Sequence, residues 1–117
     1  MKGDISPMEL IITQSAENKI KELNTSEQEY LWLFYDTDDC GCGVSGMPTV
    51  RLTDQTNDYF KFVDNKSFQV IIHKQQATFF AEQMKLDYLG NSFRLSGPEG
   101  VLNPIIPESD LLKGEVA

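Results

Sequence analysis

Both cysteines of the chain lie one residue apart in a glycine-rich segment, and their sulfurs are the side chains best suited to chemistry. Cys40 and Cys42 are separated by Gly41 and followed by Gly43 and Gly46. Side chains one residue apart can face the same side of an extended turn, and glycine permits the unusual φ values that such a turn needs. Thiolates are soft ligands for iron, zinc and copper(I), and they are also redox-active. The segment therefore predicts either a metal site on Cys40 and Cys42 or a thiol–disulfide pair.

Three aspartates just before the cysteines bear on this choice. Asp36, Asp38 and Asp39 could offer hard oxygen ligands to iron. Their negative charges would also raise the pKa values of the two thiols, which works against a reactive thiolate and in favour of a bound cation. A disulfide between Cys40 and Cys42 would close a small strained ring and would be readily reduced. A thiol-redox role stays open as an alternative to metal binding.

Composition and charge limit the other functions. The 117 residues predict one domain over 1–117, and 40% hydrophobic content is enough for a packed core. Eighteen acidic against ten basic residues leave a formal net charge of −8. Binding to nucleic acid or to an anionic membrane needs a Lys/Arg-rich face, and none is visible, so we expect neither partner.

Localisation and catalysis are predicted from what the sequence lacks. No apolar run approaches the ~20 residues of a membrane span, and residues 1–7 lack the apolar stretch of a secretory signal. Two cysteines cannot form a disulfide framework, so we expect a reducing, cytoplasmic location. The sequence has no nucleophile elbow, phosphate-binding loop or dinucleotide fingerprint. His73, the only histidine, follows an apolar strand and is expected to cap or to lie at the surface. We therefore do not expect an enzyme.

The apolar pattern predicts the elements that must position the cysteines. Helices are expected at 13–23, with Thr13 as N-cap, and at 73–84. Their apolar stripes at helical spacing are Ala16, Ile20 and Leu23, and Ala77, Phe80 and Met84. After Pro98 we expect loop and tail, because Pro104 and Pro107 restrict regular structure. The predicted strands are 8–12, 30–35, 49–52, 59–63, 67–72, 86–89 and 92–95. Residues 30–35 are nearly continuously apolar, so this strand should be covered on both faces, and 86–89 and 92–95 should form a hairpin about Gly90-Asn91. This order favours an α+β domain with mixed or antiparallel sheets, a core over about 8–100 and a tail over 101–117.

Several of these segments, in this order, resemble a known family. They are Ser45-Gly46-Met47, 63–67 (Val-Asp-Asn-Lys-Ser), 86–89 (Leu-Asp-Tyr-Leu) and 93–95 (Phe-Arg-Leu), followed by Pro98. The set is similar to the HesB/IscA-like, A-type iron–sulfur biogenesis domain. The resemblance implies a flattened barrel of mixed β-sheets packed with two helices, often dimeric. It also implies a protein that binds iron or an iron–sulfur cluster and passes it to acceptor proteins during cluster assembly.

The chain departs from the family pattern at the ligands. Family members carry one cysteine in the Ser-Gly-Met turn, and in an ungapped comparison it falls on Val44 of this chain. They carry a Cys-Gly-Cys pair in the C-terminal tail, whereas no cysteine follows Pro98 here. A cluster usually needs four protein ligands, so a site made of cysteines alone would need Cys40 and Cys42 from two chains.

Three functions follow from these observations. The first is an assembly protein that holds iron or a labile cluster on Cys40 and Cys42, shaped by Gly41, Gly43 and Gly46, across a homodimer, and delivers it to acceptor or assembly proteins. The second is a metal-free family member that acts as a protein-binding module. The third is a small redox protein that uses a Cys40–Cys42 disulfide.

Overall fold

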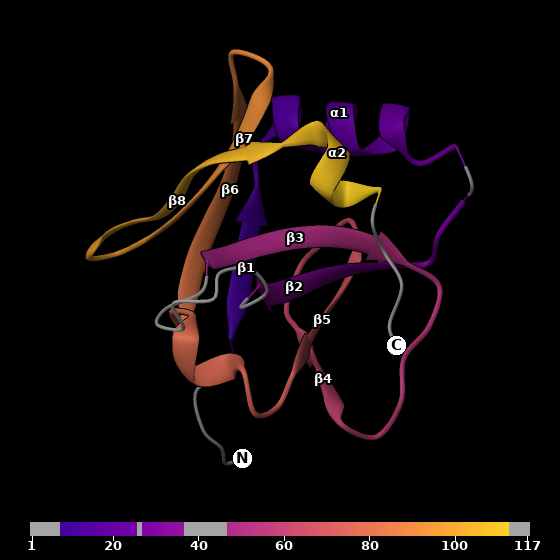
Figure 1. Cartoon of the computed structure of the whole chain (residues 1–117), viewed down its shortest axis with the longest axis vertical. Coiled ribbons are helices and arrows are strands. Elements are labelled where there is room, and N and C mark those ends of the chain that lie inside the picture. The colour runs from indigo at the N-terminus through magenta and orange to yellow at the C-terminus, as the bar shows by residue number, and fades with distance from the viewer. Residues whose placement is uncertain (1–7, 26, 37–46, 113–117) are drawn as a thin grey trace.

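The computed structural model describes residues 8–25, 27–36 and 47–112, which form two four-stranded sheets and two helices (Figure 1). The predicted α+β class is confirmed. Sheet one has the order β1 (Glu9–Ile12), β6 (Gln83–Leu89), β7 (Ser92–Gly97), β8 (Gly100–Pro107). Sheet two has the order β3 (Met47–Thr53), β2 (Tyr30–Asp36), β5 (Gln69–His73), β4 (Phe60–Val63). Both sheets are mixed, because β1 runs parallel to β6 and β2 runs parallel to β5.

The two sheets meet at both of their edges, but in different ways. On one side a single bridge pairs Glu9 with Asp64, where the Leu10 N–H donates to the Asp64 carbonyl at 2.9 Å. On the other side β3 and β8 are in contact, and the described link is the Asn103 side chain, which donates to the Pro48 carbonyl at 2.7 Å. The described strands thus form a flattened barrel that is not closed by a continuous hydrogen-bond ladder.

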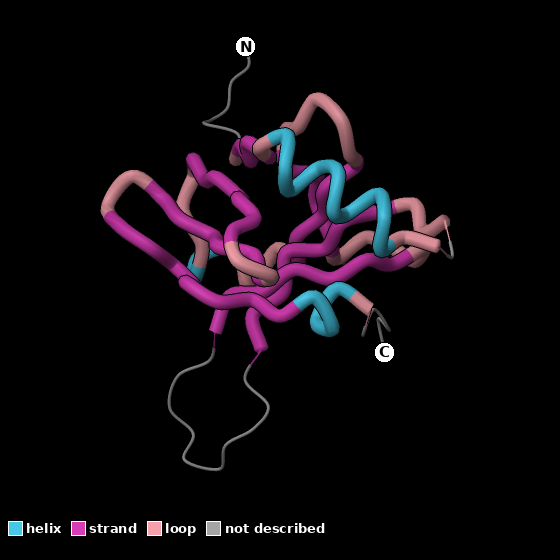
Figure 2. Tube along the Cα trace, turned by 90° about the horizontal axis from the view of Figure 1, so that it is seen from above, coloured by secondary structure: helices cyan, strands magenta, loops and turns pink. Residues whose placement is uncertain are grey.

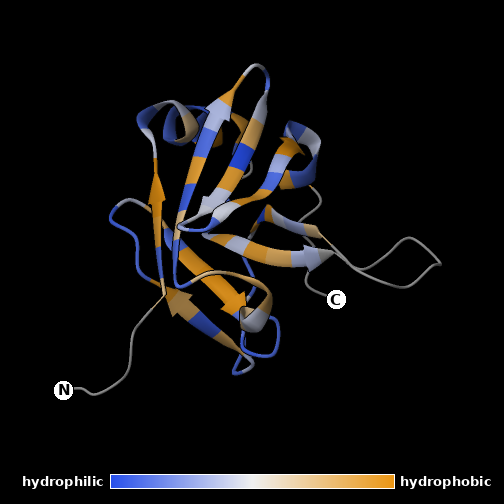
Figure 3. Ribbon diagram, turned by 90° about the vertical axis from the view of Figure 1, so that its left-hand side faces the viewer, coloured by the Kyte–Doolittle hydropathy of each residue, from blue (hydrophilic) through white to orange (hydrophobic). Residues whose placement is uncertain are grey.

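One hydrophobic core fills the space between the two sheets. Successive side chains of a strand point to opposite faces, and Figure 3 shows the resulting alternation of hydrophobic and hydrophilic residues along the strands. The β2 strand is covered on both faces, as its continuous apolarity predicts. Leu31 and Leu33 face the core, while Trp32 on the other face is only 5% exposed beneath Phe34 and Phe60.

Helix α1 (Gln14–Leu23) forms where the sequence predicts it and packs against β6. Figure 2 shows the long helix lying over the strands. Thr13 is the N-cap, since its hydroxyl oxygen accepts the Ala16 N–H at 3.3 Å. The same hydroxyl donates to the Asp87 carboxylate at 2.9 Å, which joins the helix start to sheet one. Ala16 and Ile20 are fully buried, so the predicted apolar stripe faces the core.

Two turns between strands have clear structural roles. Asn65 accepts the N–H groups of Ser67 and Phe68 at 2.8 and 2.9 Å, and its side-chain amide donates to the Leu10 carbonyl at 2.6 Å. It therefore shapes the turn before β5 and links it to β1. Gly90 and Asn91, with φ of 60° and 74°, form the two-residue turn of the predicted β6–β7 hairpin.

The helix predicted at 73–84 does not form. Strand β5 continues through His73, a short 3-10 helix η1 (Ala77–Phe79) follows, and β6 begins at Gln83. Met84 and Leu86 are both buried with Lys85 exposed between them, so this stretch has the period of a strand and not of a helix. The helical spacing of Ala77, Phe80 and Met84 was coincidental, because Met84 belongs to β6.

The segment after Pro98, expected as loop and tail, forms β8 and helix α2 (Glu108–Leu111). Strand β8 tolerates Pro104 because it is an edge strand whose pairing with β7 shifts register there. Asn103, Ile106 and Leu111 are buried, so these residues contribute to the core. The second helix of the domain is therefore α2. Neither described helix is long and apolar enough to cross a membrane.

Candidate functional site

The cysteine segment connects β2 to β3, two neighbouring antiparallel strands of sheet two. Its predicted site residues, Cys40, Gly41, Cys42, Gly43 and Gly46, lie outside the described residues, and their roles stay predictions. The structure does describe the two strand ends that carry the segment. The last pair of the β2–β3 ladder joins Asp36 to Met47, so the segment starts and ends at adjacent backbone positions. We call the four residues Tyr35, Asp36, Met47 and Pro48 the hairpin base.

On the β2 side, Gln76 holds the hairpin base. Pairing between β2 and β5 ends at Leu33 and Ile72, so the next backbone groups of β2 have no strand neighbour on that side. The Tyr35 N–H donates to Gln76 Oε1 at 3.1 Å, and Gln76 Nε2 donates to the Tyr35 carbonyl at 3.4 Å. The carboxamide thereby takes the place of a strand neighbour for the Tyr35 backbone. Stacking of the Tyr35 ring on Phe79, with centroids 4.0 Å apart, fixes the same contact.

On the β3 side, Asn103 and α2 hold the hairpin base. Tyr35 pairs with Pro48 in the β2–β3 ladder but directs its N–H away from β3, toward Gln76. In such a pair the Pro48 nitrogen also points away from β2, toward the outer edge of β3. Proline is tolerated there because no ladder hydrogen bond needs its missing N–H. The Pro48 carbonyl accepts from Asn103 Nδ2 at 2.7 Å. One residue further, the Thr49 hydroxyl donates to Asp110 at 2.8 Å. Both ends of the cysteine segment are thus anchored by side chains from distant parts of the chain.

Helix α2 is itself tied to the opposite sheet. The Tyr88 hydroxyl donates to the Glu108 carboxylate, and this bond is the largest cause that raises the pKa of Tyr88 above its ordinary value. Lys19 on α1 lies 3.8 Å from Glu108 and 3.3 Å from Glu22. The hydrogen bond to Glu22 is the largest cause that raises the pKa of Lys19. Asp110 of α2 also accepts the hydrogen bond from Thr49, the residue that follows the hairpin base in β3. The bonds of α2 therefore connect this end of β3 to sheet one.

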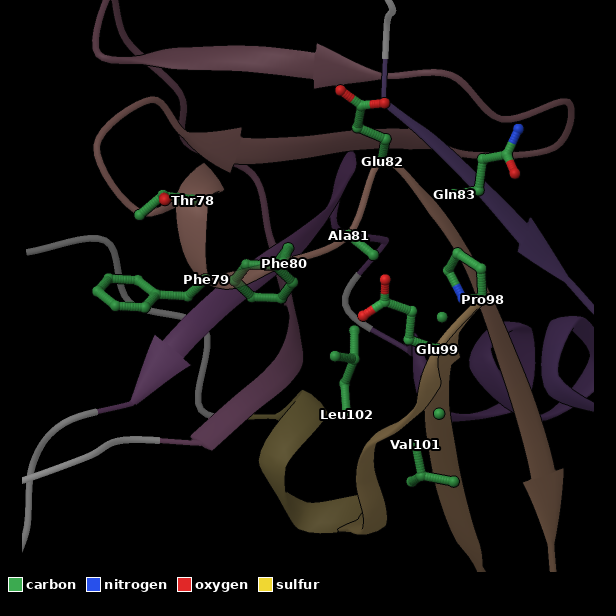
Figure 4. Close-up of a pocket in the computed structure, with 12 residues that line it drawn as sticks. Thr78, Phe79, Phe80, Ala81, Glu82, Gln83, Pro98, Glu99, Val101 and Leu102 are labelled. Carbon is green, nitrogen blue, oxygen red and sulfur yellow. The ribbon is translucent and has the colours of Figure 1, made fainter.

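An open groove of about 520 Å³ lies next to the hairpin base (Figure 4). One wall is formed by residues 78–83, from η1 to the start of β6, and the other by residues 97–102 at the β7–β8 turn. Phe79 belongs to the wall formed by residues 78–83 and is also the residue that stacks on Tyr35. Phe79 therefore connects the groove to the hairpin base through its contact with Tyr35.

His73 lies in an aromatic group and not in a metal-binding cluster of described residues. Its Nδ1 accepts the Gln75 N–H at 3.1 Å, and its ring stacks on Tyr59 and contacts the edge of Phe60. Within residues 8–25, 27–36 and 47–112, no three His, Cys, Asp or Glu side chains are grouped as a metal site. The expected surface or capping role of His73 agrees with these contacts.

The residues that anchor the hairpin base had no recognisable sequence signal. Gln76 sits in the segment predicted as a helix, and its partner Tyr35 is 41 positions away. Asn103 precedes Pro104, a dipeptide more typical of a turn than of a buried strand. A prediction of β8 would have required recognising that its two prolines fall on an edge.

Comparison with known proteins identifies the family. The family model for iron–sulphur cluster biosynthesis matches residues 8–107. The chain belongs to the iron–sulphur cluster biosynthesis family. This membership gives it a role in iron–sulphur cluster biogenesis, and the expected HesB/IscA-like resemblance is confirmed.

Individual relatives agree with this assignment. The uncharacterised protein YqkB of Bacillus subtilis (strain 168) is 27% identical over 100 residues, which cover 83% of this chain and 94% of YqkB. Among solved structures, a Lactobacillus acidophilus protein assigned provisionally to Fe–S biosynthesis matches 91% of this chain and 95% of its own, with a TM-score of 0.67 and 22% identity. IscA solved with its [2Fe–2S] cluster matches 82% of this chain and 97% of its own, with a TM-score of 0.60 and 13% identity. At these identities the two structures establish a shared fold.

Proposed function

We propose that this family member is a non-enzymatic carrier that binds iron or a labile iron–sulfur cluster through Cys40 and Cys42 and transfers it to acceptor proteins. The observation that carries the proposal is the hairpin base. Gln76 and Asn103 hold the two ends of the cysteine segment at adjacent backbone positions. A segment held at both ends, whose two cysteines could ligate iron, suits a ligand that must be bound and then released.

The number of thiols favours a site shared by two chains. A cluster usually takes four protein ligands, and each chain offers two cysteines. Two copies that meet at their cysteine segments would supply all four. Because such a site needs two chains, occupancy would rise with protein concentration and a homodimer would form on loading. We place this carrier in the cytoplasm, because a reducing compartment keeps cysteine thiols available as ligands.

Anaerobic reconstitution with ferrous iron and sulfide tests the proposal. The wild-type chain is compared with Cys40→Ser, Cys42→Ser and the double variant by visible absorption, iron and sulfide content, and sedimentation. We expect thiolate-to-iron absorption in the wild type only, at about one cluster per two chains, with a shift from monomer to dimer. Asp54→Asn, in a turn remote from the cysteine segment, serves as the control for iron held loosely by surface carboxylates. Equal iron in the wild type and the double cysteine variant would contradict the proposal.

A second function is supported by the C-terminal segment. The resemblance implies a Cys-Gly-Cys pair in the C-terminal tail of family members, whereas the C-terminal segment of this chain has no cysteine, forms β8 and α2, and buries Ile106 and Leu111. A metal-free binding module would use the same fold without cysteine ligands. It predicts that the double cysteine variant keeps all partner binding. The redox alternative predicts a reversible two-electron Cys40–Cys42 disulfide, which alkylation and mass measurement of the oxidised and reduced protein would detect.

A further inference from the structure

The groove beside the hairpin base is lined mainly by apolar side chains, and two of them are exposed. Phe79 is 48% exposed at one end, and Val101 is 52% exposed on the opposite wall. Between them Phe80 and Leu102 are partly buried against the core. Figure 4 shows Phe80 and Leu102 near the middle of the groove, with Phe79 and Val101 at its two ends. Apolar side chains gathered in an open groove are typical of an interaction site.

The charges of the groove have one sign. Glu82 and Glu99 line it, and none of its described lining residues is a lysine or arginine. The Glu99 carboxylate is solvent-exposed and points toward the centre of the groove (Figure 4). The whole chain also carries a net charge of −8. A partner with positive charge beside an apolar anchor would therefore be both attracted and oriented.

The groove is preformed. A Cβ atom at Gly97 would lie 3.0 Å from the Ala81 Cβ, so only glycine lets the two walls approach this closely. The Phe79 wall is fixed by its stacking on Tyr35 and by the Gln76 hydrogen bonds to the Tyr35 backbone. A rigid site loses less conformational entropy when it binds a partner.

We propose that this groove is the docking site for an extended segment of the acceptor protein, with an apolar side chain flanked by Lys or Arg. The inference rests on the proposed carrier function, because it places the acceptor beside the hairpin base. The partner's apolar side chain would pack against Phe80 and Leu102 in the middle of the groove, and its cation would face Glu99. An open groove with exposed side chains at both ends accommodates a continuing chain better than a small enclosed ligand.

The experiment uses the full chain and a phage-displayed library of random peptides as the probe. Enriched peptides are synthesised, their affinities are measured by fluorescence anisotropy, and their contacts are mapped by amide chemical-shift changes. We expect sequences that combine Leu, Ile, Val or Phe with Lys or Arg. The perturbed amides should fall within residues 78–83 and 97–102.

Two matched pairs of variants locate the site. Val101→Glu should weaken peptide binding by about tenfold or more, whereas Ile105→Glu, on the same strand, 66% exposed and outside the groove, should not change it. Glu99→Lys should weaken binding of the cationic peptides, whereas Asp58→Lys makes the same charge change at an exposed site outside the groove. No enrichment, equal effects within either pair, or shifts mapped to other residues would overturn the proposal.

Iron loading separates this inference from the proposed function. Val101→Glu should take up iron and sulfide as the wild type does, because it lies outside the cysteine segment. Peptide binding without iron loading would refute the carrier function and leave a binding module. Iron loading without selective peptide binding would refute the groove as the docking site.

Discussion

Replacing Asn103 with alanine tests whether one buried side chain holds the β3 end of the hairpin base. Asn103 is 5% exposed, donates to the carbonyl of buried Pro48 at 2.7 Å and accepts the Ile105 N–H at 3.1 Å. A buried carbonyl left without a donor costs about 1–3 kcal/mol, and the second hydrogen bond contributes about 0.5–1.5 kcal/mol. We expect Asn103→Ala to lower the free energy of unfolding by about 2–4 kcal/mol.

Asn57 offers a matched control. Its side chain accepts the Tyr59 N–H, two residues ahead, at 2.8 Å, in the same pattern as Asn103 and Ile105, but it is exposed and makes no bond like that to Pro48. Asn57→Ala should cost at most about 1 kcal/mol. Urea denaturation at pH 7 measures both variants, and a loss of 3 kcal/mol corresponds to a fall of about 10 °C in Tm. If the two variants differ by less than about 0.5 kcal/mol, the Pro48 bond is not a significant anchor and the reasoning fails.

Two further predictions concern the groove wall and the start of α1. Gly97→Ala should lower the free energy of unfolding by about 1–2 kcal/mol, because its new methyl group would lie 3.0 Å from the Ala81 Cβ. Urea denaturation measures the change. An unchanged free energy of unfolding would show that the two walls of the groove can move apart at no cost. The Thr13 hydroxyl and then the Tyr88 N–H lower the pKa of Asp87 below its ordinary value of 3.8, so its stabilisation is complete above that pH and is lost as the pH falls through the lower folded-state pKa. Asp87→Asn should therefore lose less stability than the wild type on acidification below about pH 4, and parallel pH–stability curves would contradict this.

The helix predicted at 73–84, which does not form, shows why local patterns could not predict the secondary structure of that part of the chain. Ala77, Phe80 and Met84 have helical spacing, but Met84 is taken up by β6, where parallel pairing with β1 places it opposite Leu10. Gln76 is likewise committed to the backbone of Tyr35. Both interactions join residues far apart in sequence, and such tertiary contacts override weak local helix propensity.

The C-terminal segment shows the same limit, but here local patterns missed a strand that does form. Pro104 and Pro107 are poor residues for a central strand, and the sequence does not reveal that β8 lies at an edge with a register shift. Edge or centre is a property of the assembled sheet. For this reason the anchor Asn103 and one wall of the groove could not be foreseen.

The sequence by itself determined most strands, helix α1 with its Thr13 cap, the β6–β7 hairpin and the family. These features depend on alternation, capping and turn chemistry, which act over a few residues. The spacing of Cys40 and Cys42, with one residue between them, is likewise read directly from the sequence. Only the tertiary structure decided that Gln76 and Asn103 anchor the hairpin base and that Phe79 joins it to a groove. Those contacts arise when the packing of two sheets brings distant segments together, and no short-range pattern encodes which segments will meet.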